Sequence, residues 1–539
     1  MLLRDFSPEL RKQTACALGL ICGLEIVLLL LARTPRARLN VAQMAAVVFL
    51  ATVLLRFLRS GRPRKDAPEQ PSGSAFLAWL GVVLGALVWG IMLTCYFVSD
   101  DFGILYLSRP PLLHQVKFVF LETNRAGAFY RPLTYSSYFL DHALWDRWPA
   151  GYHLTNLLLH AAAVGGLFVL LRQLGVGRQT AAITCSLFAV MPIQAEAVGW
   201  MSGRFDVLSA TLTIWAAACY VRSNTRNNPI AYPSALMLYA LSIISKETGF
   251  VLPLLLIAID VIMFRTRPGK KIIGFFAAGG VLFLYRSFAL GGLGGYKSAG
   301  ISSAVDVTWR TFEGLLIRAP SQLLLGLNWT QPSGIWVVSL AAVMATTFMW
   351  LAVSTRPDPR RSALIMFAFI WMVVTAVPAH FLTLIGPGLS NSRILYSPSV
   401  GMAMVLGQLI AGMNTARIRN LAAAGLFVFL NLGLLHNLAA WRWTSQLAKD
   451  TLEDVTRLAP LPASQTQFVF SNLPDSIRGV FFFRVGLTES IRMAYGRDDI
   501  SAVRDSDIEI PPNALNAGPQ IRLYWKGDES ELLLRRDSP

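Results

Sequence analysis

Long apolar runs alternate with short polar segments over most of the chain. An apolar run of about 18 or more residues predicts a helix that crosses a membrane, because the hydrocarbon core is about 30 Å thick. The pattern predicts an all-α polytopic membrane protein with about thirteen transmembrane helices. The predicted spans are 14–31, 39–57, 75–98, 152–171, 179–192, 206–221, 231–245, 250–264, 272–290, 334–353, 363–380, 394–411 and 420–437. The first could be a cleaved signal peptide, but its length favours a retained span.

The segment from Trp441 onward is more polar. It predicts a helix over 441–457 and short strands at 468–470, 479–487 and 521–525, which suggest a small α/β domain. We therefore divide the chain into three parts. These are an N-terminal hairpin with a basic loop (1–74), a transmembrane core with a long loop at 99–151 (75–440) and a C-terminal domain (441–539).

Composition supports a membrane protein. Hydrophobic residues make up 54% of the chain and charged residues 15%, with a mean hydropathy of +0.49, whereas soluble domains carry about 25% charged residues. The net charge of +17 fits cytoplasmic loops and anionic lipid headgroups, and no nucleic-acid motif accompanies it. The five cysteines lie in apolar runs, so neither a disulfide framework nor a zinc site is predicted.

Basic residues set the expected orientation. With the N-terminus inside, the inner loops include the basic segments 56–65, 265–271 and 356–361, although the outer segment 33–38 carries three arginines against this rule. This topology places the loop 99–151 and the C-terminal domain outside the cytoplasm.

Two adjacent acids, Asp100 and Asp101, follow the predicted span 75–98 directly. A carboxylate pair at a membrane edge is costly unless water or a partner solvates it. The pair either caps the next helix or belongs to a site on the outer face.

The next span carries His153, Asn156 and His160, whose spacing places them on one helical face. Polar groups on one stripe of a membrane helix face the bundle interior or a water-filled cavity. The stripe therefore predicts either hydrogen bonds between helices or the wall of a polar pocket.

Further charged residues are expected at the outer face: Glu196, Arg204, Asp206, Lys246, Glu247 and Arg393. Several carboxylates together with three cations suit an anionic substrate. The alternative is salt bridges within each loop, Arg204 with Asp206 and Lys246 with Glu247.

Five ordered segments carry a family resemblance: 129–163, 191–210, 245–260, 390–404 and 439–453. Together they resemble bacterial relatives of the transmembrane-and-tetratricopeptide O-mannosyltransferases, of the GT-C glycosyltransferase class. The resemblance implies a multi-span bacterial inner-membrane enzyme with an extracytoplasmic site and a polyprenyl-phosphate sugar donor. It maps the family's acidic motif onto Asp100 and Asp101. The chain departs from the family in its extra spans before Asp100 and in lacking tetratricopeptide repeats.

Transfer of a sugar from a lipid phosphate to a hydroxyl group needs a base, cations for the leaving phosphate and an apolar groove for the lipid. We expect the base in the acid pair, with Asp101 slightly favoured over Asp100. Arg393, Lys246 and Arg204 are the phosphate candidates. Further substrate contacts are expected from Glu196, His153, Asn156, Asp206 and Glu247.

No cofactor is required by this chemistry, although a divalent cation is compatible with it. The expected sugar is mannose or another hexose or pentose, and the acceptor is a hydroxyl group of an exported protein or a glycan. Two other readings stay open. A transporter or lipid flippase would carry polar residues on both sides of the membrane midplane, and an inactive scaffold would tolerate loss of both aspartates.

Overall fold

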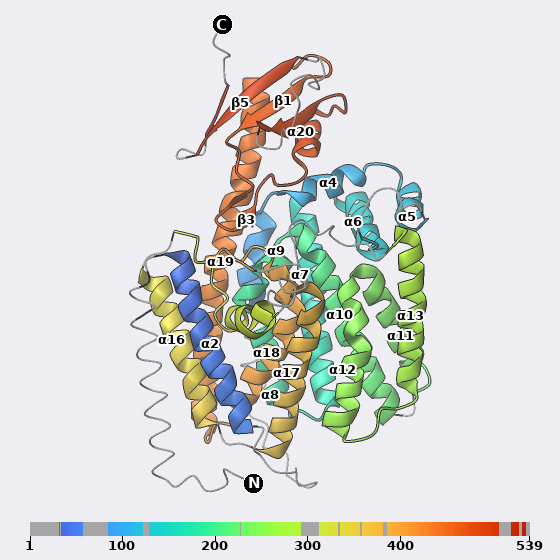
Figure 1. Cartoon of the computed structure of the whole chain (residues 1–539), viewed down its shortest axis with the longest axis vertical. Coiled ribbons are helices and arrows are strands. Elements are labelled where there is room, and N and C mark those ends of the chain that lie inside the picture. Colours follow the sequence, from blue (N-terminus) through green and yellow to red (C-terminus); the bar gives the residue numbers. More distant parts are fainter. Residues whose placement is uncertain are drawn as a thin grey trace.

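The computed structural model describes residues 28, 32, 34–57, 83, 85–121, 129–226, 228–292, 312–332, 335–355, 358–380, 385–505, 519–527 and 531–534. Figure 1 shows a bundle of helices with a small sheet-containing domain above one end. The long helix α19 (Ala416–Leu458) runs from the bundle into this domain without a break. The domain boundary expected at residue 441 therefore falls inside one continuous helix.

In the described part of the chain, eight helices are long and apolar enough to cross a membrane, or nine if one bent pair counts as a span. The chain is thus a multi-pass membrane protein. The eight are α2 (Pro35–Phe57), α7 (Pro149–Gln173), the segment Glu247–Phe264 formed by η5, α12 and η6, α13 (Lys271–Leu290), α16 (Ile335–Ser354), α17 (Pro359–His380), the segment Ser392–Ala411 formed by η8 and α18, and α19.

The expected count of thirteen spans is not confirmed. The predicted span 179–192 is one half of the bent pair, α8 (Arg178–Ala189) with η3 (Pro192–Gln194) and α9 (Ala195–Gly199), which turns by 48°. The span 231–245 is the 15-residue α11 (Ala231–Ser245), and 206–221 lies in α10 (Arg204–Thr225); neither is among these eight helices. Only part of 75–98 is described, as a helix ending in η1 (Gly90–Thr94), and 14–31 lies outside the described residues except for residue 28.

The centre of the bundle is formed by α7, α8, α10 and α18 (Tyr396–Ala411), and nearly every residue of α18 is buried. Around it pack α11, α17, η7 (Gly314–Arg318) and α15 (Ala319–Leu324), with α2 against α15 and α16. This packed centre fixes the ends of α7, α9 and α10, from which several of the charged residues described below project.

Three short helices cover the end of the bundle that faces the small domain: α4 (Asp100–Leu107), α5 (Leu112–Leu121) and α6 (Pro132–Trp145). The described part of the loop 99–151 is therefore largely helical. The short helix η4 (Met201–Gly203) lies between α9 and α10 and contacts α4.

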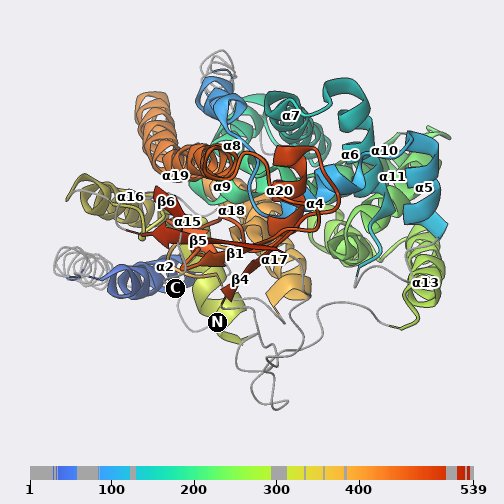
Figure 2. The same ribbon diagram turned by 90° about the horizontal axis from the view of Figure 1, so that it is seen from above.

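The C-terminal domain holds a four-stranded sheet in the order β4-β1-β5-β6. β1 (Gln467–Ser471) pairs in parallel with β4 (Ser501–Arg504) and β5 (Gln520–Lys526), and β5 pairs antiparallel with β6 (Glu531–Leu534). Helix α20 (Leu487–Tyr495) packs on α4, as both views show (Figures 1 and 2). The strand expected over 479–487 is wrong as a strand of this sheet, since only Val480–Phe481 (β3) is a strand there, paired with β2 (Ser476–Ile477).

Candidate active site

The acid pair begins α4 at the junction between the bundle and the C-terminal domain. Asp100 and Asp101 form the first turn of the helix, where its N-terminal dipole favours negative charge. The preceding residue, Ser99, has φ 49° and ψ −120°, and its N–H donates to the Phe482 carbonyl at 2.7 Å. A non-glycine residue in such a conformation costs roughly 1–3 kcal/mol and persists only where its surroundings impose it. The backbone at the acid pair is therefore held from the C-terminal domain.

Asp101 is buried and fully engaged with the protein. Its Oδ2 accepts the Val98 N–H at 3.0 Å, and its Oδ1 accepts the N–H and hydroxyl of Ser202 at 3.1 and 2.6 Å. Burial raises the pKa of Asp101 to about 7, and the hydrogen bonds from Ser202 and Val98 oppose that rise. Asp101 therefore ties α4 to η4, and its carboxylate does not face an open space.

Asp100 is only half-buried, and none of the described residues hydrogen-bonds to its carboxylate. Burial raises the pKa of Asp100, and the positive charges of Arg484 and Arg393 oppose that effect. A carboxylate that is partly desolvated but open to solvent suits proton transfer better than one whose oxygens are already occupied. The geometry thus favours Asp100 over Asp101 as a base, which reverses the order expected from sequence.

Arg393 lies at the start of η8 (Ser392–Leu395) and forms an ion pair with the buried Glu196 of α9. The other Glu196 oxygen accepts the Ser392 hydroxyl at 3.1 Å and the Arg393 N–H at 3.3 Å. The Arg393 guanidinium lies over the Trp200 ring, 5.0 Å from its centroid. Glu196 therefore positions Arg393, and its oxygens are taken up by this contact.

A second charged cluster lies where α11 meets η5. Lys246 Nζ is 2.5 Å from Asp206 Oδ1, while Glu247 pairs with Arg131 at 2.8 Å and with Arg286 at 3.5 Å. The alternative of a salt bridge within the loop between Lys246 and Glu247 is therefore wrong, since each residue pairs with another element. These five side chains bring three cations and two carboxylates together at one place.

Arg204 is fully buried, although it was expected to bind phosphate. Its guanidinium donates to Asn156 Oδ1 at 2.7 Å, to Asp141 at 2.5 Å and to the Tyr152 carbonyl at 3.1 Å. The alternative of a salt bridge between Arg204 and Asp206 is also wrong, since Arg204 pairs with Asp141 and Asp206 with Lys246. A guanidinium whose donors are all directed at α6 and α7 holds these helices together and is not open to a substrate.

The polar stripe on α7 mainly joins helices. Asn156 Nδ2 donates to the Trp200 carbonyl at 2.8 Å, and His160 lies within hydrogen-bonding distance of the Tyr396 hydroxyl, at 2.8 Å. His153 is buried on the same helix. Between the two alternatives for this stripe, the contacts of Asn156 and His160 favour hydrogen bonds between helices.

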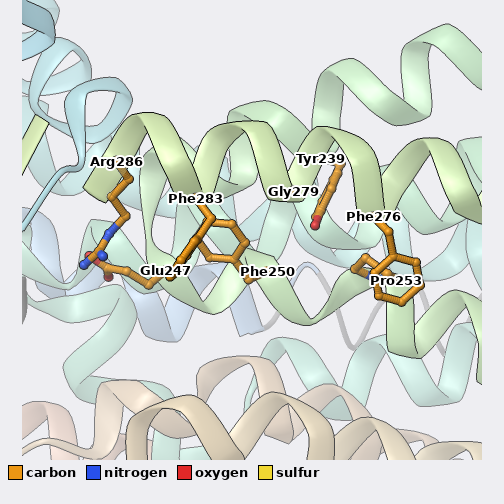
Figure 3. A pocket seen from close by; sticks show the side chains of 9 residues that line it. Tyr239, Glu247, Phe250, Pro253, Phe276, Gly279, Phe283 and Arg286 are labelled. Atoms are coloured by element: carbon orange, nitrogen blue, oxygen red, sulfur yellow. The ribbon is translucent and has the colours of Figure 1, made fainter. Parts of the chain in front are cut away.

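An apolar groove of about 570 Å³ lies beside the second charged cluster. It runs along α13 and is lined by Tyr239, Phe250, Pro253, Phe276, Gly279, Gly280 and Phe283, with Glu247 and Arg286 at one end (Figure 3). A Cβ atom at Gly280 would meet nothing within 4 Å. The groove thus combines a long apolar wall with a charged end, and several of its side chains point toward one another across it.

Sequence reasoning missed four residues of this region: Arg131, Arg286, Arg484 and Asp141. Arg131 lies in the quoted segment 129–163, and its spacing carries no signal for a partner in η5. Asp141, in the same segment, pairs with Arg204, Arg286 pairs with Glu247, and Arg484 stacks on the Phe481 ring. Within the described ranges, no group of three or more His, Cys, Asp or Glu side chains could hold a metal ion.

No protein-family model matches the chain. Among curated proteins it is 31% identical over 184 residues to protein O-mannosyl-transferase TMTC3 of Homo sapiens, which covers 30% of this chain and 20% of that protein. It is 39% identical over 94 residues to human TMTC2, covering 17% of this chain and 11% of that protein. It is 23% identical over 428 residues to human TMTC4, and this match covers 66% of this chain and 57% of that protein. The matches thus span about a fifth or less of the length of TMTC3 and TMTC2.

Solved structures give weaker similarities. ArnT from Cupriavidus metallidurans bound to undecaprenyl phosphate superposes with a TM-score of 0.42 and 14% identity, covering 84% of this chain and 94% of that one. The oligosaccharyltransferase AglB from Archaeoglobus fulgidus in complex with an inhibitory peptide and a dolichol-phosphate superposes with a TM-score of 0.38 and 12% identity. The superposition covers 85% of this chain and 64% of that one. By sequence the chain is similar to the TMTC protein O-mannosyl-transferases, which confirms the resemblance carried by its five ordered segments.

Proposed function

We propose that the chain is a GT-C-type membrane glycosyltransferase that moves a sugar from a polyprenyl monophosphate to an acceptor hydroxyl group, with Asp100 as the base. The observation that carries this proposal is the arrangement of charge beside the apolar groove. Arg131, Arg286 and Lys246 form ion pairs with Glu247 and Asp206 at the charged end of the groove. Arg393 lies 6.0 Å from the centroid of the Phe481 ring, next to the Phe482 carbonyl that accepts the Ser99 N–H beside Asp100. Charged groups therefore extend from the end of the groove to the open carboxylate.

The groove along α13 suits the lipid part of such a donor. Its walls are aromatic and aliphatic, and it lies on helices that are apolar enough to cross a membrane. A prenyl chain buries apolar surface there at about 25 cal/mol per Å². Arg286 at the charged end (Figure 3) would meet the phosphate.

The cations next to the groove suit the phosphate. Arg131, Arg286, Lys246 and Arg393 face the carboxylates Glu247, Asp206 and Glu196, so the set has a net charge of +1 before a substrate arrives. Ion pairs that already fix the cations reduce the reorganisation needed to stabilise a leaving phosphate. Arg204 does not belong to this set, because it is fully buried and its guanidinium donates to residues of α6 and α7.

The reaction needs one base and no covalent enzyme intermediate. The acceptor oxygen attacks the anomeric carbon as the bond from that carbon to the phosphate oxygen breaks, and the polyprenyl phosphate leaves with the electron pair. Asp100 takes the proton of the acceptor hydroxyl. A single displacement of this kind inverts the anomeric configuration, and a positioned base contributes about 10²–10⁴-fold to the rate.

Asp206 is suited to hold the sugar. Its Oδ1 pairs with Lys246, while its Oδ2 is buried and lacks a hydrogen bond within the described part of the chain. A buried acceptor without a donor is costly, and a sugar hydroxyl would satisfy it. The names of the curated relatives make mannose the first sugar to test.

We further propose a bacterial inner membrane as the location, with the site and the C-terminal domain outside the cytoplasm. Residues 75–440 would form the catalytic core, and residues 1–74 would form an additional N-terminal hairpin with a basic loop. The basic loops 265–271 and 356–361 support this orientation. An exported protein or a glycan would supply the acceptor hydroxyl.

The test uses purified protein in proteoliposomes with polyprenyl-phosphate-mannose labelled in the sugar and an extract of cell-envelope acceptors. The proposal expects label to move to the acceptor and the product to have the inverted anomeric configuration by NMR. Movement of intact labelled lipid across the bilayer without transfer would favour a flippase instead. No transfer from this donor or from a panel of other lipid-phosphate sugars would contradict the proposal.

A further inference from the structure

One extended segment of the C-terminal domain lies against the acid pair. This segment, Arg478–Gly486, is called the strap below. The Ser99 N–H donates to the Phe482 carbonyl at 2.7 Å, and the rings of Phe102 and Phe483 stack with their centroids 5.8 Å apart. The strap therefore lies directly against the first turn of α4.

The strap also contacts the loop that carries Arg393. The Ser390 hydroxyl in this loop donates to the Gly479 carbonyl at 2.8 Å, and Asn328 Nδ2, in the segment that follows α15, donates to the Arg478 carbonyl at 2.6 Å. The same nine-residue segment is thus attached to both parts of the proposed site, the acid pair and the cation loop. Such a connection is more than is needed to join two domains that α19 already links.

Arg484 is the exposed cation of the strap. Its guanidinium lies 3.9 Å from the centroid of the Phe481 ring, and that ring is buried against Trp200 at a centroid distance of 5.6 Å. Arg393 lies 6.0 Å from the same Phe481 centroid. An arginine stacked on an aromatic ring keeps the N–H groups at its edge available for an oxygen of a ligand.

The two arginines are placed differently with respect to the groove. Arg393 comes from the bundle, where it pairs with Glu196 and lies over Trp200, while Arg484 comes from the strap, and the positive charges of both arginines act on Asp100. Arg393 thus links the donor side to Asp100, and Arg484 approaches Asp100 from the C-terminal domain. The acceptor hydroxyl must lie at Asp100 on the side opposite the leaving phosphate, because the displacement is in line.

We propose that Arg484 is an acceptor-binding residue, so that the C-terminal domain takes part in acceptor recognition through the strap. This inference rests on the proposed function. Arg484 would bind an anionic oxygen, such as a carboxylate, that lies next to the acceptor hydroxyl. Its positive charge would also keep Asp100 ionised and able to accept the proton.

The test separates donor from acceptor kinetics in the full-length protein. Arg484→Ala should raise the acceptor concentration for half-maximal rate about tenfold, because a hydrogen bond to a charged group is lost. The half-saturating concentration of labelled polyprenyl-phosphate-mannose should stay within about twofold. The acid limb of the pH–rate profile should move to higher pH, since removing the positive charge raises the pKa of Asp100.

Two variants serve as controls. Arg478→Ala removes another strap arginine, which stacks on Trp443 of α19 at 3.8 Å, and should change neither kinetic constant. Arg484→Lys keeps the charge, so the acid limb should return to its wild-type position while acceptor affinity recovers only in part.

The charge of the acceptor gives a separate comparison. Serine peptides flanked by aspartate should lose more affinity from Arg484→Ala than matched peptides flanked by asparagine. If neither peptide series is used, the same comparison is made on acidic and neutral fractions of the envelope extract.

The outcomes decide between the two proposals. A rise in the half-saturating concentration of the donor alone, or no change in that of the donor or the acceptor, would overturn the role of Arg484. Neither result would contradict the proposed transferase activity. An equal loss with acidic and neutral acceptors would overturn the anionic acceptor. Absence of transfer by the wild type would overturn both proposals.

Discussion

Asp101 and Ser202 are joined by two hydrogen bonds, from the N–H and from the hydroxyl of Ser202 to the same carboxylate oxygen. This contact fixes the start of α4 to η4, the turn that leads into α10. Asp101 therefore has a structural role in our account, and its neighbour Asp100 is the proposed base. Substitution of Asp101 should therefore mainly affect stability, and substitution of Asp100 should mainly affect activity.

Ser202→Ala removes the shorter of these two hydrogen bonds. We expect the free energy of unfolding to fall by roughly 1.5–3 kcal/mol, the range for a hydrogen bond to a charged group. Denaturant or thermal unfolding in detergent measures the change. Ser136→Ala is the matched control, because its hydroxyl donates only to the Pro132 carbonyl within α6. An equal loss in both variants would show that the Asp101 contact has no special weight.

Asp101 should also make stability depend on pH. Its pKa in the folded protein is about 7 against an ordinary value of 3.8, so the folded state binds this proton more tightly than the unfolded state does. The resulting stabilisation is fully present below about pH 3.8 and is lost as the pH rises through 7. The Tm of the wild type should fall between pH 5 and pH 8 by more than that of Asp101→Asn. Parallel slopes in the two proteins would refute this assignment.

Arg204→Ala should be severely destabilising. It would leave the Asp141 carboxylate buried without its cation, and breaking a buried pair costs about 3–5 kcal/mol. Arg457→Ala breaks the pair with Asp454, in which 70% of the arginine side chain is exposed, and should cost at most about 1 kcal/mol. Unfolding of both variants in detergent gives the comparison. A small effect for Arg204 would mean that water already reaches this network.

Gly280→Leu should fill the apolar groove. A Cβ at Gly280 meets open space, so the longer side chain can be accommodated without displacing the backbone, but it occupies the proposed lipid site. We expect the half-saturating donor concentration to rise roughly tenfold, equivalent to about 1.4 kcal/mol. Gly425→Leu on α19, where a Cβ also meets nothing within 4 Å, should leave that constant unchanged. Equal donor affinity in both variants would place the lipid elsewhere.

The sequence predicted the helical membrane core and the position of the acid pair, because both depend on local patterns. Apolar runs identify spans, and two aspartates after such a run mark a helix start. The count of spans is not confirmed at 206–221 and 231–245, where the structure has the helices α10 and α11 but neither is among the eight that are long and apolar enough to cross a membrane.

The partners of the charged residues were not predictable in the same way. Helical spacing shows that His153, Asn156 and His160 share a face, but not what that face contacts. Arg204 and Lys246 were paired by proximity in the chain, whereas tertiary packing pairs them with Asp141 and Asp206. The strap was expected to be a strand because of its apolar residues, which pack onto the bundle instead of into the sheet.

The most direct test of the central claim compares sugar transfer by Asp100→Asn and Asp101→Asn, both shown to be folded by their unfolding transitions. We predict that Asp100→Asn lowers the rate of transfer from labelled polyprenyl-phosphate-mannose by about 10²–10⁴-fold with near wild-type stability. Asp101→Asn should keep a much larger share of the activity and show its effect in stability. Wild-type transfer by Asp100→Asn, or a greater loss of activity in folded Asp101→Asn, would contradict the assignment of Asp100 as the base.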